Sequence, residues 1–193
     1  DFKSADKAIK DLVLGLPGRH NVENAVAASA VALILGVSEE QLRAALKSFT
    51  GAQRRFEIHV RNENHVYVDD YAHHPTELNA AILSAKELFP TKKITGVFQP
   101  HLFTRTRDFV DGFAESLSLL DSLIMLDIYP ARELPIPGIT SQTILEKVTI
   151  SDKSLVKKED LLAEIKHRNP EVIMTLGAGD IDQFVEPIKH LLN

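Results

Sequence analysis

Polar side chains that could bind or activate a ligand gather in one segment, from Asp69 to Pro75. It reads Asp-Asp-Tyr-Ala-His-His-Pro, so two carboxylates, a phenol and two imidazoles lie within seven residues. Carboxylates accept hydrogen bonds from ribose hydroxyls, and imidazoles can donate to a carboxylate. We interpret the segment as a site for a polar ligand. The alternatives are a helix-capping aspartate with solvated histidines and, less favoured, a metal site, because adjacent histidines point in different directions.

Cationic side chains follow Pro100, which ends an apolar run. They are His101, Arg105 and Arg107. Arginine pairs with carboxylates or phosphates through two parallel hydrogen bonds. Cations at the start of a helix oppose its dipole by roughly 0.3–1 kcal/mol each. This cost favours an anion-binding role over an ordinary solvated helix start, although Arg107 beside Asp108 also fits a surface pair.

Two shorter segments carry weaker signals. Residues 177–180, Gly-Ala-Gly-Asp, are most simply a tight turn from a strand to a helix, with Asp180 as N-cap. Arg54 and Arg55 stand where the sequence pattern changes. An arginine there could reach a ligand held between domains, or pair with Glu57 on the surface.

The run His20-Asn-Val-Glu-Asn24 begins an alanine-rich helix expected at 20–36. Asparagine amides suit the edge of a purine because they both donate and accept hydrogen bonds. A plain N-cap role for Asn21 explains the run at least as well. The apolar stripe of this helix is expected to comprise Ala25, Ala28, Ala32 and Leu35.

A second helix is expected to begin at Ser38, with Leu42, Ala45, Leu46 and Phe49 on its inner face. Two helices and a short lead-in bury too little to form a good core alone. Residues 1–54 are therefore predicted to be the tail of a larger domain, and 55–193 a domain of their own.

Strands and helices alternate after residue 54. Apolar strands separated by amphipathic helices predict an α/β fold, a Rossmann-like and mostly parallel sheet with helices on both faces. Ligands bind such sheets beyond the carboxyl ends of the strands, where segments 69–75, 99–105 and 177–180 fall. The expected strands are 56–60, 65–69, 94–98, 122–126, near 155, and 172–176, and the expected helices are 76–88, 106–119, 141–147, 159–168 and 181–192.

Composition narrows the possible functions. The 193 residues include no cysteine, which excludes disulfides, thiolate zinc sites and a cysteine nucleophile. The net charge of −5 gives no reason to expect nucleic acid or an anionic membrane as partner. No apolar run approaches the roughly 20 residues of a membrane helix, and no signal segment is present. The chain starts at Asp1, so we expect a piece of a longer protein.

Known phosphate-binding and nucleophile motifs are missing from the chain. The sequence contains no G-x-x-x-x-G-K-[ST] phosphate loop, no G-x-G-x-x-G after a strand and no G-x-S-x-G elbow. These residues alone therefore carry no recognised signature of a phosphate cradle or a dinucleotide site.

Five ordered motifs together resemble the Mur ligase family, in particular the member that adds L-alanine. The resemblance covers the chain from about residue 15 onward. The matching runs are 18–25 (Gly-Arg-His-Asn-Val-Glu-Asn-Ala), 53–57 (Gln-Arg-Arg-Phe-Glu), 69–77 with 98–101 (Phe-Gln-Pro-His), 129–131 (Tyr-Pro-Ala) with Glu133, and 177–181.

The resemblance implies a cytoplasmic, three-domain enzyme. ATP with Mg²⁺ would phosphorylate the carboxylate of UDP-N-acetylmuramate, and the amine of L-alanine would then attack the acyl phosphate. This chain would be the C-terminal tail of the central ATP-binding domain plus the whole third domain, and inactive alone. Two alternatives stay open: the related ligase that recycles murein tripeptide, and a non-catalytic module that binds a nucleotide or an acidic metabolite.

The resemblance also assigns nucleotide contacts. Asn24 would contact adenine and Asp70 the ribose of ATP. Tyr71 would lie near the nucleotide, and Arg55 would approach the phosphates across the gap between domains.

Four further residues are assigned to the incoming alanine by the same resemblance. His73, His101 and Arg105 would surround it as catalytic and binding residues, with Arg105 on its carboxylate, and His74 would also belong to the substrate site. No metal ligand is assigned in this chain.

Two positions depart from the family pattern. Leu102 stands where many members carry an arginine, which makes Arg105 more critical, and Arg132 stands where glycine is usual.

Overall fold

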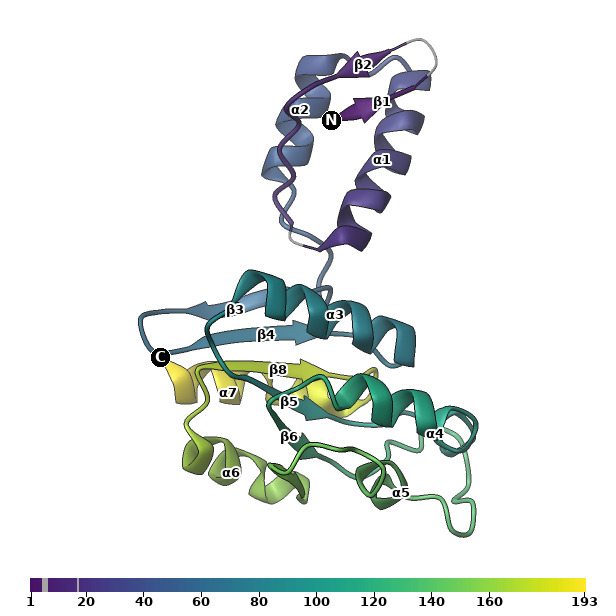
Figure 1. Ribbon diagram of the computed structural model, residues 1–193, viewed down its shortest axis with the longest axis vertical. Helices are drawn as coiled ribbons and strands as arrows, with labels where there is room; N and C mark the ends of the chain where they lie inside the picture. The colour runs from purple at the N-terminus through teal and green to yellow at the C-terminus, as the bar shows by residue number, and fades with distance from the viewer. Residues whose placement is uncertain (5–6, 17) are drawn as a thin grey trace. The chain divides into compact units, whose positions relative to one another are not determined.

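The computed structural model describes residues 1–4, 7–16 and 18–193. The chain divides into two compact units, Asp1–Ala52 and Gln53–Asn193 (Figure 1). The boundary falls two residues before the predicted one, so Arg54 belongs with the second unit. The side chain of His20, in the run expected to face adenine, lies outside the described part.

The first unit packs two helices against a short hairpin. The helices α1 (Arg19–Ile34) and α2 (Glu39–Ser48) lie close to their predicted positions. Ser38 caps α2 through a reciprocal capping box with Gln41. The sequence did not lead us to expect the antiparallel pair β1 (Phe2–Lys3) and β2 (Ala8–Ile9). Phe2 and Ile9 of this pair form a small core with Leu42.

The predicted apolar faces of these helices are partly wrong. In α1, Ser29 is buried and Leu33 is partly buried, whereas Ala28 and Leu35 are exposed. Because α1 is apolar nearly all round, its sequence could not decide which side packs. In α2 the inner positions Leu42 and Leu46 are confirmed, but two others are exposed, Ala45 and Phe49.

The second unit contains a six-stranded sheet with strand order β3-β4-β8-β5-β6-β7. Only the edge pair β3–β4 is antiparallel, so the predicted mostly parallel sheet is confirmed. Apolar β5 and β8 are buried along their whole length, as expected for strands covered on both faces. The strands are β3 (Glu57–Arg61), β4 (Val66–Asp70), β5 (Ile94–Phe98), β6 (Ser122–Met125), β7 (Lys153–Leu155) and β8 (Val172–Leu176).

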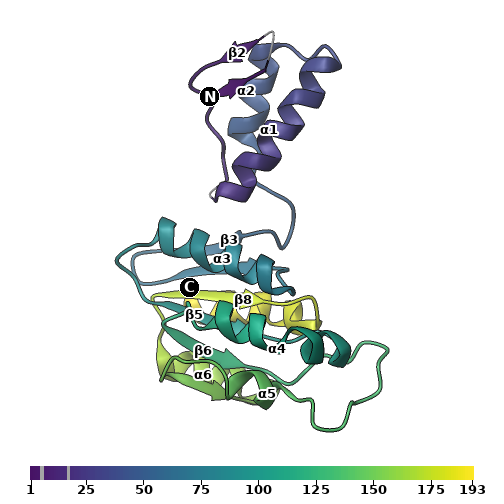
Figure 2. The same ribbon diagram turned by 45° about the vertical axis from the view of Figure 1, so that its right-hand side comes forward.

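Helices cover both faces of this sheet, also as predicted (Figure 2). One face carries α3 (Pro75–Leu88), α4 (Phe103–Leu117) and α5 (Ser141–Leu145). The other carries α6 (Leu161–Arg168), α7 (Val185–Leu192) and the 3₁₀ turn η2 (Asp180–Phe184). A second 3₁₀ turn, η1 (Lys158–Asp160), precedes α6.

The last strand in sequence, β8, lies between β4 and β5. All three strands are parallel, so their carboxyl ends meet at one edge of the sheet. This order brings together the three segments singled out in the sequence, 69–75, 177–180 and 99–105. Within the part of the chain that the structure describes, no helix is long and apolar enough to cross a membrane.

Candidate active site

The loops that follow β5 and β8 interlock at this edge. Gln99 is fully buried; its amide donates to Asp180 Oδ1 at 2.8 Å and accepts from the main-chain N–H of Ile181 at 3.0 Å. The two glycines make this close approach possible. A Cβ on Gly177, which has φ of +140°, would lie 2.7 Å from the carbonyl oxygen of Gln99, and one on Gly179 would collide with the Gln99 side chain.

Asp180 does not cap the following turn as predicted, because its carboxylate is already engaged. It accepts from Gln99 and from Lys158 Nζ, at 2.7 Å to Oδ2. Burial raises the pKa of this carboxyl, but the hydrogen bonds from Lys158 and Gln99 outweigh burial and hold the pKa below its ordinary value. The pair therefore anchors the loop after β8.

Four predicted site residues form one contiguous cluster. The Tyr71 and His73 rings meet edge to face with centroids 5.1 Å apart, and the His73 and His101 rings do so at 6.2 Å. Arg105 completes the series through a 3.3 Å contact between its Nη1 and His101 Nδ1. Two loops and the first turn of α4 thus bring a phenol, two imidazoles and a guanidinium together.

The His73 imidazole is held by its own loop and by α3. Its Nδ1 lies 2.8 Å from the carbonyl oxygen of Tyr71 and 3.3 Å from Glu77 Oε2. Glu77 also accepts from the main-chain N–H of His73 at 2.9 Å. The capping carboxylate at the start of α3 therefore also faces the His73 ring.

The His101 imidazole lies against Tyr129. Its ring stacks on Tyr129 with centroids 5.7 Å apart and an interplanar angle of 19°. Burial, and then the charges of Arg105 and His73, lower the pKa of His101 below its ordinary value, against a smaller opposing effect of Glu133. His101 therefore favours its neutral form at neutral pH.

The loop after β6 supplies two residues that the site prediction left out, Tyr129 and Glu133. Tyr129 is bonded through its main chain to Pro100 (2.8 Å) and Leu102 (3.0 Å). Glu133 accepts from the main-chain N–H of Thr104 at 2.9 Å and from its hydroxyl. These hydrogen bonds lower the pKa of Glu133. In the sequence, both residues belong to the motif 129–131 (Tyr-Pro-Ala) with Glu133. Only the family resemblance drew attention to this motif.

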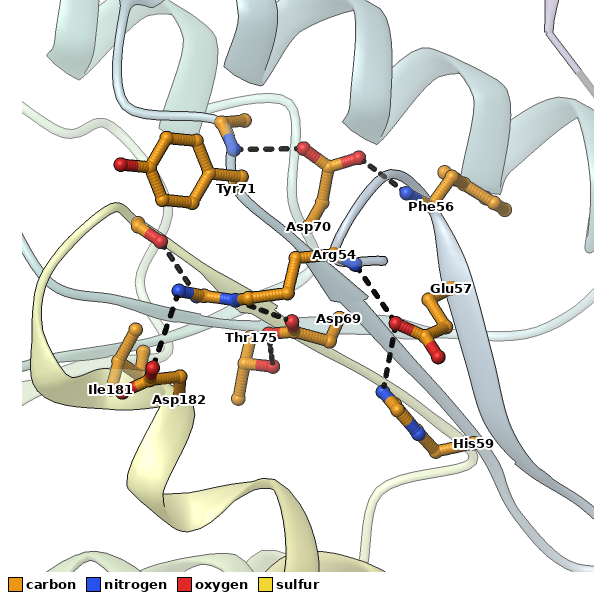
Figure 3. Close-up of polar contacts among 12 residues, drawn as sticks. Arg54, Phe56, Glu57, His59, Asp69, Asp70, Tyr71, Thr175, Ile181 and Asp182 are labelled. Carbon is orange, nitrogen blue, oxygen red and sulfur yellow. Dashed lines mark hydrogen bonds and ion pairs between the residues drawn. The ribbon is translucent and has the colours of Figure 1, made fainter. Parts of the chain in front are cut away.

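Asp70, predicted to hold a ribose, is buried behind the cluster with 8% of its surface exposed. Its two oxygens accept from the main-chain N–H groups of Phe56 (2.7 Å) and Ala72 (2.8 Å) (Figure 3). Burial raises the pKa of this carboxyl, and the two hydrogen bonds and the charge of Arg55 oppose that rise. Asp70 thus ties the start of β3 to the turn that carries Tyr71.

Arg54, not Arg55, is the internally bonded arginine of the pair. Its guanidinium donates to Asp69 Oδ2 and to the carbonyl oxygen of Gly177, both at 2.8 Å, and lies 5.2 Å from the centre of the Tyr71 ring (Figure 3). The alternative that the sequence offered, an arginine–Glu57 ion pair, does not form among the described residues; Glu57 accepts instead from the main-chain N–H of Arg54 at 2.8 Å. The residue pattern alone did not separate the roles of the two arginines, and only the family resemblance assigned Arg55 to the phosphates.

The remaining predicted residues lie outside the ring cluster. His74 caps α3 and packs edge to face on Phe109 with centroids 4.6 Å apart. Arg55 is exposed, and within the described residues no hydrogen bond or ion pair engages its side chain. Asn24 is exposed on α1 in the first unit. The described residues include no group of three or more acidic or imidazole side chains that could hold a metal ion.

The chemistry of the cluster suits an anion beside a titratable group. Arg105 is partly buried, and among the described residues no carboxylate pairs with it. By contrast, Arg107 on the same helix pairs with Asp108 at 2.7 Å on the surface. A partly desolvated guanidinium without a counter-ion is prepared to bind a carboxylate or phosphate.

Comparisons with known proteins agree with this arrangement. A family model described as Mur ligase, glutamate ligase domain, matches residues 54–179. The UDP-N-acetylmuramate–L-alanine ligase of Parabacteroides distasonis is 53% identical over 192 residues, covering 100% of this chain and 42% of that relative. The enzyme of the same name from Flavobacterium johnsoniae is 51% identical, covering 100% of this chain and 43% of that relative. The chain thus spans less than half the length of these relatives.

Two solved structures also match this chain. The UDP-N-acetylmuramate-alanine ligase of Thermotoga maritima matches with a TM-score of 0.72 and 30% identity, over 92% of this chain and 39% of that one. A murein peptide ligase from Psychrobacter arcticus matches with a TM-score of 0.65 and 22% identity, over 94% of this chain and 38% of that one. At this identity the match shows a shared fold alone. The sequence, the fold and the matched segment agree, and the chain belongs to the Mur ligase family.

Proposed function

We propose that this chain is the amine-binding part of a UDP-N-acetylmuramate–L-alanine ligase. The whole protein would use ATP to activate the carboxylate of UDP-N-acetylmuramate and would join it to L-alanine through an amide. The names of the relatives at 51–53% identity support this activity. The residues that hold ATP and Mg²⁺ would lie mainly outside this chain, which has no phosphate-loop motif.

The single observation that carries the amine-side assignment is the Arg105 guanidinium, which pairs with no carboxylate among the described residues and contacts His101, the ring next to His73. L-alanine presents a carboxylate one carbon from its amine. If the Arg105 guanidinium holds that carboxylate, the amine lies within a few ångströms, where His73 and His101 can reach it. Charge and alignment matter most in acyl-phosphate chemistry, so such positioning is itself catalytic.

Three of the proposed nucleotide-binding residues, Arg55, Asp70 and Tyr71, belong to the second unit, where β3 begins and β4 ends. Arg55, exposed and without an ion-pair partner among the described residues, would meet phosphate, and Tyr71, which is 37% exposed, would lie against the nucleotide. Asp70 would reach a ribose hydroxyl only with the lone pairs left by its two main-chain bonds. Asn24 would contact adenine. Bound ATP with Mg²⁺ would supply the phosphoryl group and neutralise its charge.

The test is a ligation assay on the full-length protein with UDP-N-acetylmuramate, ATP, Mg²⁺ and either L-alanine or murein tripeptide. We expect amide formation and ADP release with L-alanine, and none from the 193-residue chain alone. Preference for the tripeptide would move the assignment to the recycling ligase. Turnover by the isolated chain, or tight ATP binding to it in calorimetry, would contradict the proposed division of labour between the chain and the rest of the protein.

A further inference from the structure

The two histidines of the cluster have opposite proton arrangements. Each ring nitrogen of a neutral imidazole is either a donor or an acceptor, and the partner of one nitrogen decides the role of the other. Both rings have a partner at Nδ1, and the two partners differ in kind: a guanidinium for His101 and a carbonyl oxygen for His73.

The partner of His101 can only donate. A guanidinium carries N–H groups and no acceptor, so Nδ1 of His101 must accept from Arg105. The proton of the neutral ring then lies on Nε2. His101 therefore presents an N–H group to the site and has no free lone pair there.

The partner of His73 can only accept. The carbonyl oxygen of Tyr71, 2.8 Å away, takes a hydrogen bond from Nδ1, and the carboxylate of Glu77 lies 3.3 Å from the same nitrogen. The proton of neutral His73 thus lies on Nδ1, and Nε2 keeps its lone pair. A carboxylate facing Nδ1 also stabilises the imidazolium that forms when Nε2 takes a proton.

Both Nε2 atoms are available to a ligand. Within the described residues neither atom has a hydrogen-bond partner, and neither is among the buried unpaired atoms. The edge-to-face contact of the rings, at 6.2 Å between centroids, places a base and a donor beside one another.

We propose that His73 is the general base of the ligation, that His101 is a hydrogen-bond donor and not a base, and that Glu77 is a positioning residue for His73. This inference rests on the proposed function. His73 Nε2 takes a proton from the alanine ammonium, the neutral nitrogen attacks the acyl-phosphate carbon, and the C–N bond forms. The carbon–oxygen bond to phosphate breaks and phosphate leaves with the electron pair. The second proton that the attacking nitrogen must lose to become an amide goes to this departing phosphate.

The charges around His73 are consistent with these roles. Glu77 approaches from α3, His101 and Arg105 from the loop and helix after β5, and Tyr71 from its own loop. Of these groups, only Glu77 is negative. Removing its charge while keeping its hydrogen-bonding shape is therefore the cleanest perturbation of the base.

The proton arrangement can be tested on the 193-residue chain itself. Nitrogen-15 NMR of its histidines at neutral pH separates the two neutral tautomers, and the variants His73→Asn and His101→Asn assign the signals. We expect the proton of His73 on Nδ1 and that of His101 on Nε2. The methionine of Arg105→Met cannot donate a hydrogen bond to Nδ1. In this variant His101 should no longer favour the Nε2-protonated tautomer, whereas His73 should still carry its proton on Nδ1. The reverse arrangement in the unmodified chain would overturn the inference.

The catalytic role is tested in the full-length protein. His73→Gln should lower kcat/KM for L-alanine by about 10²–10⁴-fold, the usual contribution of general base catalysis. Hydroxylamine, largely unprotonated at neutral pH, should still trap the acyl phosphate in this variant. Glu77→Gln should move the acidic limb of the pH–rate profile to lower pH, because the imidazolium loses its negative neighbour. His190→Gln, on an exposed face of α7, should change nothing.

The outcomes separate the inference from the function on which it rests. If the unmodified full-length protein does not ligate L-alanine, the proposed function fails, and the NMR result still decides the proton arrangement. If it ligates L-alanine but His73→Gln keeps the full rate and an unchanged acidic limb, His73 is not the base. An unaltered acidic limb in Glu77→Gln would remove the positioning role of Glu77.

Discussion

At the scale of single residues, two adjacent arginines have opposite environments. Arg54 has a left-handed backbone (φ 57°) and a side chain that is 15% exposed, bonded to the fully buried carboxylate of Asp69. That carboxylate also accepts from Thr175 at 2.6 Å. Arg55 points to solvent. Burying a carboxylate is tolerated only when it is paired, so Arg54 is required for the sheet edge and Arg55 is free for a ligand.

The two arginines predict a matched pair of stability results. Arg54→Ala leaves Asp69 buried without its cation and should lower the free energy of unfolding of the second unit by about 3–5 kcal/mol. Arg55→Ala should change it by less than about 0.5 kcal/mol. Urea unfolding of the 193-residue chain measures both. Equal losses of unfolding free energy for Arg54→Ala and Arg55→Ala would contradict the assignment. Arg54→Lys should cause a loss between these two values, because lysine keeps the charge but loses one of the two directed hydrogen bonds of the guanidinium.

Arg105 gives a second prediction at this scale. In the full-length protein Arg105→Ala should raise the KM for L-alanine and leave the KM for ATP nearly unchanged. Loss of a charged hydrogen-bond partner costs roughly 1.5–3 kcal/mol, about a 10- to 150-fold change. Steady-state kinetics with each substrate varied would show it. Arg107→Ala, whose side chain pairs with Asp108 on the surface, is the control; an alanine KM equal to that of the control would remove Arg105 from the site.

At the scale of elements, the start of α4 decides how the cluster is presented. The helix begins at Phe103, three residues earlier than the predicted 106, and its N-cap Leu102 has φ of 74° and no side-chain capping bond. The missing cap comes from Glu133, 29 residues away, which accepts from Thr104. A carboxylate at a helix N-terminus is favoured by the dipole. His101 and Arg105 flank this capped turn, so the loop after β6 helps to place both.

This remote cap predicts a pH-dependent stability. Folding lowers the pKa of Glu133 below its ordinary value of 4.5. The stability that ionised Glu133 contributes is therefore complete above pH 4.5 and is lost as the pH falls through the pKa of the folded state. Glu133→Gln should therefore destabilise the chain at neutral pH, and the difference should shrink in acid. Urea midpoints across this range measure it. The control is Glu115→Gln, an exposed position on α4, which should show no such trend with pH. If the loss of stability in Glu133→Gln is the same at every pH, the charge of Glu133 is not responsible for it.

At the scale of the whole molecule, the two units have very different cores. The second buries apolar side chains on both faces of a six-stranded sheet. Among the described residues of the first unit, the buried apolar side chains are Phe2, Ile9 and Leu42, and α1 leaves Ile34 83% exposed. Hydrophobic stabilisation scales with the apolar area removed from water, so the first unit has far less to offset its chain entropy.

Hydrogen exchange of the intact 193-residue chain should show this difference. Amides of α1 and α2 should exchange through openings of low free energy, whereas those of the central strand β8 should exchange only near global unfolding. Mass spectrometry on peptides from each unit measures both. Equal protection of α1 and β8 would mean that the first unit is stabilised by something other than its own core.

Local chemistry was readable from the sequence. The buried strands β5 and β8 were placed to the residue because each is a short apolar run between polar turns. The helix that follows Pro75 is likewise determined by its neighbours in the chain. The residue types of the site, with Asp70, Tyr71, His73, His101 and Arg105 at strand ends, needed no structure because parallel sheets bind ligands there.

What only the tertiary structure decided depends on partners distant in sequence. The insertion of β8 between β4 and β5 makes neighbours of loops some eighty residues apart, such as Gln99 and Ile181. The side of α1 that packs, the burial of Arg54 rather than Arg55 and the capping of α4 by Glu133 are likewise set by long-range contacts. A side chain's role follows from what surrounds it, and the order of residues alone does not specify those surroundings.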